Sequence, residues 1–220
     1  MTNRLLPIRL VFALALAGVN LAAQTAKLPA DIDPKSLSRL PLLSRDQMDA
    51  EGQRVYDVII GKDQPNRSGP VGAVLYSPAV GEPFELINRA LRKSVNGTQM
   101  FEICTLIAGR AFDNQYEWSA HEVAAQKAGV DQKVIDAIKF NRSVDGLPEK
   151  EATVIRFGRA IFNDHTVGSE LYAKVIQLFG QRGMIDLAVT FGDYAATAIV
   201  LSAIDQHLGP DRKPLLPDGK

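Results

Sequence analysis

The sequence has few of the residues on which many protein sites depend. Among its 220 residues there is one cysteine, Cys104, so no disulfide can form within the chain. There are three histidines and one tryptophan. Apart from Glu117 and His121 at i, i+4, no residues have the spacing of metal ligands, and neither a Gly-x-Ser-x-Gly nucleophile elbow nor a phosphate-binding loop is present. These absences exclude a disulfide-stabilised scaffold and argue against zinc, nucleophile-elbow and phosphate-loop chemistry.

Charge of one sign is also missing. The chain has 25 basic and 25 acidic residues, which gives no electrostatic reason to expect nucleic acid or an anionic membrane surface as a partner. Hydrophobic residues make up 46% of the sequence, which is enough for one globular domain with a core of its own.

Residues 1–23 have the features of a signal peptide. Two arginines accompany an apolar run from Leu10 to Val19, and the small residues Ala22 and Ala23 suit cleavage. The run is shorter than the roughly 20 residues that a membrane-spanning helix needs. We therefore expect a periplasmic or secreted protein without membrane contact after cleavage. An uncleaved anchor or a buried first helix are the alternatives.

The rest of the chain divides into a short connecting segment and a helical domain. Residues 24–43 hold three prolines and no periodic pattern, which predicts a linker or an arm. Residues 44–216 show helical periodicity, beginning with Ser44 as the N-cap of a helix that ends at Gly61. Sustained alternation of apolar and polar residues is absent, so the predicted fold class is all-α.

Two neighbouring helices carry the most informative residues. They are predicted over about 97–111 and 114–128, and the short connection between them favours an antiparallel pair. Glu102 and His121 lie at similar distances from the turn, so they can face each other across the pair. Glu117 precedes His121 by four residues and shares its helix face. The sequence thus predicts three proton-carrying groups in one pocket.

This arrangement suits general acid–base chemistry. Glu102 lies in an apolar stretch, where an ionised carboxylate needs a partner, and His121 and Arg110 are the candidates. A carboxylate beside a histidine fixes its tautomer and tunes its proton affinity. Arg110 could also hold a substrate carboxylate. Glu117 and Asn114 have the spacing of a capping box, so Glu117 can instead serve the helix terminus.

Each aromatic residue of the second helix can be either a core residue or part of the site. Trp118 fits a core position better than a stacking surface for a ligand. Tyr116 fits a core position whose hydroxyl reaches the pocket. His165 and His207 lie near helix ends, which is typical of capping or surface histidines.

The stretch "YEWSAHEVAAQKAGV", with the preceding "FEICTLIAGRAFDNQ", resembles the carboxymuconolactone decarboxylase family of the AhpD-like superfamily. The resemblance covers most of residues 44–216. The residues that match the family pattern in order and spacing are Glu102, Tyr116, Glu117, Trp118, His121, Ala128 and Gly129.

The resemblance implies an AhpD-like helical domain that assembles as trimers or hexamers, with no metal and no cofactor. The reaction typical of the family is a lyase reaction, the loss of carbon dioxide from a small lactone acid. By analogy, His121 would be the general acid and Glu102 would set its protonation state. Arg110, Tyr116 and Trp118 are the expected substrate-binding residues, Arg110 on chemical grounds alone.

Two alternatives remain open. Peroxidase members of the superfamily carry a Cys-x-x-Cys pair, and the corresponding positions here are Asn114 and Glu117, so peroxide reduction through that pair is excluded. One alternative is an exported helical binding protein that has lost catalysis. The other is a redox protein that uses Cys104.

Overall fold

The computed structural model describes residues 28–217, and within them it contains eight α-helices and no strand. The all-α prediction is confirmed, whereas the predicted signal peptide lies outside the described residues. The helices are α1 (Ala50–Ile59), α2 (Pro70–Ala73), α3 (Pro78–Leu91), α4 (Gly97–Ala111), α5 (Gln115–Lys127), α6 (Gln132–Lys139), α7 (Glu149–Arg159) and α8 (Ser169–Ala203).

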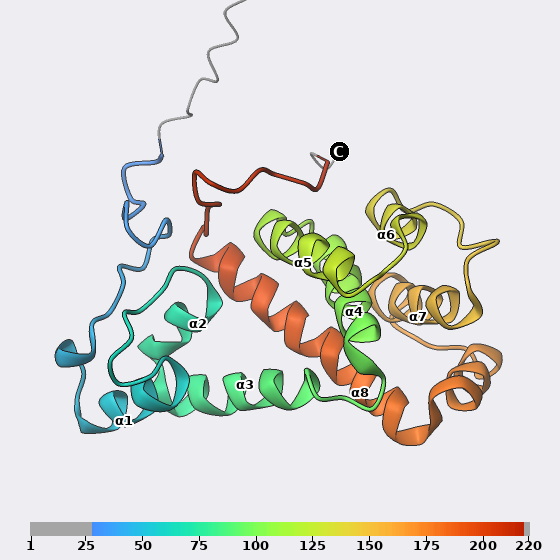
Figure 1. Ribbon diagram of the computed structural model, residues 1–220, viewed down its shortest axis with the longest axis horizontal. Coiled ribbons are helices and arrows are strands. Elements are labelled where there is room, and N and C mark those ends of the chain that lie inside the picture. The colour runs from blue at the N-terminus through green and yellow to red at the C-terminus, as the bar shows by residue number, and fades with distance from the viewer. Residues whose placement is uncertain (1–27, 218–220) are drawn as a thin grey trace, which may run out of the picture.

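Helix α4 lies at the centre of the fold. It packs against α5, α6, α7 and α8, which surround it in Figure 1. Every residue from Met100 to Gly109 is buried, as expected from the apolar character of this stretch. Glu102 is part of that buried run, so the fold forces this carboxylate to find a partner inside the protein.

Helix α8 runs along the core beside α4 and reaches from α7 to α3. The chain changes direction within α8, at Gly180 with φ 67° and ψ 176°. Only glycine adopts such angles readily. α8 is long and apolar enough to cross a membrane by length and composition alone. Its apolar character is accounted for in part by buried residues such as Leu187 and Phe191 in the core.

The first helical boundaries differ from the prediction. Ser44 caps only a short 3₁₀ segment (Arg45–Gln47), and α1 starts after Asp49. The Asp49 side chain accepts a hydrogen bond from a backbone N–H of the first turn of α1, which makes it the effective N-cap. Gly61 follows α1 with φ 106°, in the left-handed region, as expected of a glycine that ends a helix.

The segment predicted as a linker or arm contacts its own chain where it is described. The N–H of Arg39 donates to the carbonyl of Ile204, and the N–H of His207 donates to the carbonyl of Leu37, both at 2.8 Å. The described part of residues 24–43 therefore lies against the end of α8.

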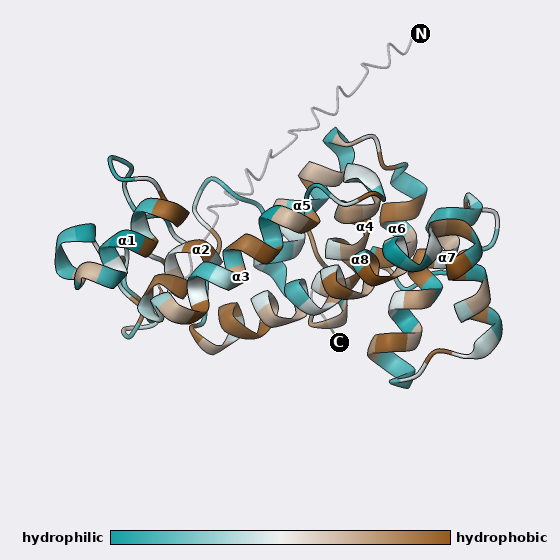
Figure 2. Ribbon diagram, turned by 90° about the horizontal axis from the view of Figure 1, so that it is seen from below, coloured by the Kyte–Doolittle hydropathy of each residue, from teal (hydrophilic) through white to brown (hydrophobic). Residues whose placement is uncertain are grey.

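Several large apolar side chains of α3 and α8 are exposed, and Figure 2 shows the apolar residues along both helices. The expected assembly into a homo-oligomer stays a prediction. The exposed residues are Val80, Leu86 and Ile87 on α3, and Ile185, Val189 and Ile199 on α8.

Candidate active site

The pair formed by α4 and α5 positions the predicted site. Its antiparallel arrangement follows from two contacts at different heights. His121 contacts Glu102, and farther from the turn the side-chain amide of Gln99 donates to the carbonyl of Gly129. Asn114 begins α5, and its side chain accepts the N–H of Glu117 at 3.0 Å. The local sequence thus fixes where α5 starts, and with it the height of His121.

Glu102 and His121 face each other across the helix pair, as the sequence predicts. His121 Nδ1 lies 2.7 Å from Glu102 Oε2. The Glu102 side chain is 4% exposed and that of His121 is 13% exposed. The buried Glu102 carboxylate needs a hydrogen-bond donor, and the imidazole can supply one only from a protonated nitrogen. Glu102 therefore keeps a proton on His121 Nδ1. The opposite nitrogen, Nε2, is left to exchange protons.

Glu117 faces that second nitrogen. His121 Nε2 lies 3.5 Å from Glu117 Oε2, and the Glu117 side chain is also nearly fully buried. Only half of the capping box is present, because the backbone N–H of Asn114 donates to the carbonyl of Gly109 and not to Glu117. Burial raises the pKa of Glu117, and the nearby His121 opposes that rise. Glu117 is therefore a second group that can carry a proton in the site.

His121 and Glu117 open into a cavity of about 240 Å³, whereas Glu102 is not among the residues that line it and reaches the site through His121. His121, Glu117 and Tyr116 from α5 line one side of it, and α3 and α8 contribute Asn88 and Tyr194 from the other. A volume of this order fits a small organic molecule.

Arginines from three separate segments lie around the cavity: Arg67, Arg92 and Arg212. Seven other arginines in the described part of the chain form ion pairs with carboxylates. No such pair is found for these three within residues 28–217. Guanidinium groups with free donors can hold a carboxylate. The cavity is thus suited to an anionic ligand.

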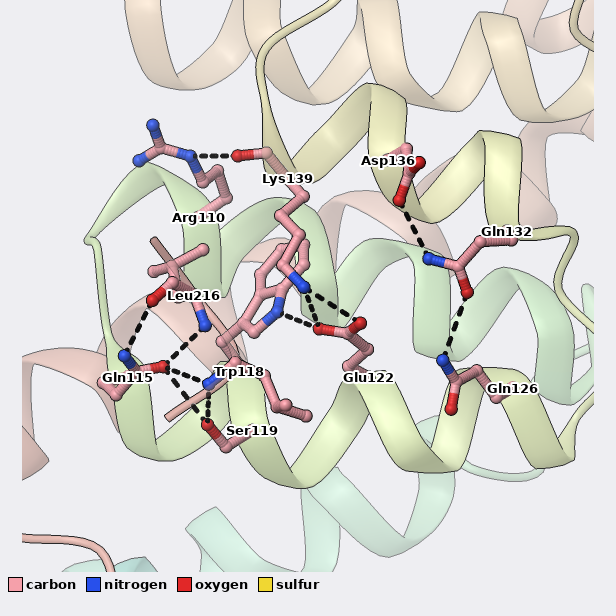
Figure 3. Close-up of polar contacts among 11 residues, drawn as sticks. Arg110, Gln115, Trp118, Ser119, Glu122, Gln126, Gln132, Asp136, Lys139 and Leu216 are labelled. Carbon is pink, nitrogen blue, oxygen red and sulfur yellow. Dashed lines mark hydrogen bonds and ion pairs between the residues drawn. The ribbon is translucent and has the colours of Figure 1, made fainter. Parts of the chain in front are cut away.

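Arg110 does not take part in this cavity, which corrects the expectation that it anchors the substrate beside His121. Its Nε donates to the carbonyl of Lys139 at 3.0 Å, as Figure 3 shows, and its guanidinium pairs with Asp113. Lys139 is the last residue of α6, where helix carbonyls lack partners and attract cations. Arg110 therefore ties α4 to α6.

Trp118 is likewise outside the cavity, which corrects its proposed contact with substrate. The side chain is fully buried, and its indole N–H donates to Glu122. Glu122 in turn accepts from Lys139 Nζ at 2.9 and 3.0 Å (Figure 3). This cluster fixes α5 against α6 and has no access to a ligand.

Tyr116 lines the cavity as predicted. Its hydroxyl donates to the carbonyl of Ser68 at 3.4 Å, and Arg212 lies over its ring at 5.5 Å. Gly69 has φ 98°, and a Cβ there would meet the Tyr116 hydroxyl at 2.3 Å. Only glycine allows this approach, so Gly69 lets the loop before α2 cover the ring.

Cys104 and the remaining histidines lie elsewhere. The Cys104 side chain is fully buried, and burial raises the pKa of its thiol, which opposes formation of the reactive thiolate. His165 is exposed at the end of the π-helical segment that follows α7. His207 lies in the segment that follows α8, with its Nε2 3.4 Å from Asp205.

Sequence reasoning did not find Asn88, Arg92 and Tyr194. Arg92 Nε donates to Asn88 Oδ1 at 2.9 Å, and Arg92 Nη2 donates to the Tyr194 hydroxyl at 3.1 Å. The i, i+4 spacing of Asn88 and Arg92 was a weak signal. Tyr194 is about a hundred residues away in the sequence, and no local pattern connects it with the pair.

Replacing Glu117 by glutamine should change how stability depends on pH. Because burial raises the pKa of Glu117 in the folded protein, ionising it costs free energy at pH values above its unfolded pKa of about 4.3. The wild type should therefore lose stability relative to Glu117→Gln as the pH rises from 4 to 8, by about 1.4 kcal/mol for each unit of pKa elevation. Urea denaturation at several pH values measures this, and parallel stability curves would contradict it.

The comparisons with known proteins define the fold. The chain matches no family model and no curated protein sequence. Among solved structures, it is similar to an alkylhydroperoxidase AhpD core, an uncharacterized peroxidase-related protein from Ralstonia eutropha JMP134. That match has a TM-score of 0.63 and 15% identity, and covers 80% of this chain and 94% of the other. The chain therefore has the AhpD-like helical fold.

Two structures of the debrominase Bmp8 share this fold. The apo form matches with a TM-score of 0.56 and 15% identity over 79% of this chain and 92% of that one. A cysteine-to-alanine variant in complex with 2,3,4-tribromopyrrole matches with a TM-score of 0.55 and 16% identity, over 79% and 94% of the two chains. At this identity the likeness concerns the fold alone.

Proposed function

We propose that the protein is a cofactor-free enzyme that moves a proton on a small lactone or cyclic carboxylic acid, in a reaction like that of the carboxymuconolactone decarboxylases. The observation that carries the proposal is the contact between Glu102 and His121, which leaves Nε2 beside Glu117 at the cavity. A histidine oriented by a buried carboxylate is a recurrent general acid or base.

In this scheme each of the three groups has a distinct task. The carboxylate of Glu102 orients the ring and offsets the positive charge of the imidazolium. His121 delivers a proton from Nε2 to the carbon that has lost carbon dioxide. Glu117, whose pKa is raised by burial, holds a further proton within reach of the same nitrogen. Proton transfer of this kind contributes about 10²–10⁴-fold to a rate.

The arginines support an acidic substrate. Arg67, Arg92 and Arg212 surround the cavity without carboxylate partners in the described chain, and they replace Arg110 as the proposed anchors. A carboxylate bound there would lie opposite a hydrogen-bonded imidazole, which places charge recognition and proton transfer in one small space.

Thiol chemistry of the kind known for peroxidases fits this chain poorly. One of the similar structures is described as peroxidase-related, and the other protein is a debrominase. Here Asn114 and Glu117 occupy the positions of the Cys-x-x-Cys pair. The remaining thiol, Cys104, is fully buried in α4.

Replacing Cys104 by alanine should leave turnover unchanged, because the thiol has no exposed surface and a raised pKa. Steady-state rates of the variant and the wild type, compared after confirming the fold by circular dichroism, measure this. A variant that folds but has lost activity would favour the redox alternative.

A screen of small lactone acids and cyclic carboxylic acids, followed by carbon dioxide release, tests the proposal itself. Release that depends on His121 supports it. A compound that binds tightly in the cavity, while mass spectrometry finds no product from any acid tested, would favour the binding protein that has lost catalysis.

A further inference from the structure

The tyrosine opposite His121 has an unusual pattern of hydrogen bonds. The Tyr194 hydroxyl oxygen accepts from Arg92 Nη2 at 3.1 Å and from Asn88 Nδ2 at 3.3 Å. Two donors occupy both lone pairs of a phenol oxygen. Its own hydrogen has no acceptor among residues 28–217, while the ring lines the cavity. The hydroxyl hydrogen is therefore available to a ligand.

The surroundings hold this hydroxyl in place. The ring of Tyr194 is 3% exposed and meets the His121 ring edge-on, with 5.0 Å between the ring centroids. It meets Phe101 in the same way at 5.6 Å, and the Arg92 guanidinium lies 4.8 Å above the ring of Phe101. The contacts with His121 and Phe101 fix the Tyr194 ring from two sides. The Tyr194 hydroxyl therefore needs little reorganisation when a charge develops near it.

Burial also keeps the proton on Tyr194. The pKa of Tyr194 is raised by desolvation, an effect that the positive charge of Arg92 opposes. The residue is therefore a neutral hydrogen-bond donor over the ordinary pH range and cannot serve as a base. Its neighbour Arg92 adds permanent positive charge.

We infer that Tyr194 and Arg92 form an oxyanion-binding pair that stabilises the enolate oxygen of the substrate while His121 handles the proton. This inference rests on the proposed function and assigns the part of the reaction that His121 cannot perform. Hydrogen-bond donors placed where charge develops are often the largest contribution to catalysis, worth about 10²–10³-fold each.

The proposed step couples the loss of carbon dioxide to the transfer of one proton. The bond between the ring carbon and the departing carboxylate breaks, and its electron pair moves through the adjoining unsaturation onto the carbonyl oxygen. Carbon dioxide leaves, and the enolate oxygen accepts hydrogen bonds from the Tyr194 hydroxyl and the Arg92 guanidinium. The enolate carbon then takes the Nε2 proton of the His121 imidazolium, and the carbonyl re-forms. The neutral imidazole that is left takes up a proton again from Glu117, which regains one from water.

Binding of 4-nitrophenol tests the pair without knowledge of the substrate. Its phenolate resembles an enolate in charge and shape, and it absorbs in the visible. The neutral 4-nitroanisole has the same ring and serves as the reference probe. We expect the wild type to bind the phenolate more tightly than the anisole. Tyr194→Phe should weaken phenolate binding by about ten- to hundredfold, with little effect on the anisole.

Two further variants keep the test decisive. Arg92→Met should weaken phenolate binding in the same way. Arg92 is exposed, so this variant should fold even if Tyr194→Phe does not. Tyr56→Phe is the matched control, because Tyr56 is equally buried at 3% exposure and its hydroxyl donates to Gln64 away from the cavity. It should bind both probes like the wild type.

Equal affinity of the wild type for phenolate and anisole would overturn the inference, as would the absence of saturable phenolate binding. Unchanged phenolate binding in the folded Tyr194 or Arg92 variant would do the same. These outcomes leave the proposed function standing, because that depends on His121. Conversely, Tyr194→Phe could weaken phenolate binding while His121→Ala leaves turnover unchanged. That result would overturn the proton-transfer mechanism, and the oxyanion-binding pair would still stand.

Discussion

Replacing His121 by alanine should lower kcat by about 10²–10⁴-fold, the usual contribution of a positioned general acid or base. The side chain is the one imidazole at the cavity in the described chain, and its Nε2 is the atom that can reach a ligand once Nδ1 is bonded to Glu102. The effect should fall on kcat more than on KM, because proton transfer acts in the transition state. Steady-state kinetics on a substrate from the acid screen measure it.

Two controls separate chemistry from folding. Adding imidazole to His121→Ala should restore part of the rate, since the variant leaves a space of matching size beside Glu102. His165→Asn is the matched variant, because His165 is exposed, away from the cavity, in a left-handed conformation that asparagine tolerates. It should keep full activity. An active His121→Ala variant would end the proton-transfer proposal.

Replacing Glu102 by glutamine should lower kcat by about 10²-fold or more. The amide has nearly the same size as the carboxylate, so the buried position stays filled. It removes the charge that faces the imidazolium, and it can donate to Nδ1 and so favour the wrong tautomer. Exchanging the carboxylate for an amide in a comparable catalytic pair costs about 10⁴-fold for this reason. The same kinetic assay measures the loss.

The pair should also behave as a unit. The double variant Glu102→Gln with His121→Ala should be no slower than His121→Ala alone, because the carboxylate acts through the imidazole. If the two losses instead multiply, Glu102 acts separately from His121, and the assignment of roles is wrong.

The α4–α5 pair is the part of the structure that sequence alone predicts best. Its local signals agree with one another: an apolar helix, a short turn, Asn114 as N-cap and Gly129 with φ 83° after the second helix. Given that geometry, a carboxylate in an apolar helix had to meet a partner at matching height, and His121 meets that condition.

The opposite wall of the cavity could not be predicted in this way. It is built from α3, α8 and loops far apart in the sequence, and only the packed fold brings Arg92 and Tyr194 together. Arg110 is the opposite case, a residue that the sequence places at the site and the structure does not. Helical spacing places it two turns after Glu102, but the free carbonyl of Lys139 at the end of α6 attracts its side chain away.

Nitrogen-15 NMR of the histidine side chains tests the central geometry most directly. The chain has three histidines, so a His121→Asn variant assigns the signals of His121 by their loss. At a pH where the ring is neutral, we predict a proton on Nδ1, held by Glu102, and a bare Nε2. Glu102→Gln should disturb this pattern. A neutral His121 that carries its proton on Nε2, or one that Glu102→Gln leaves unchanged, would contradict the account.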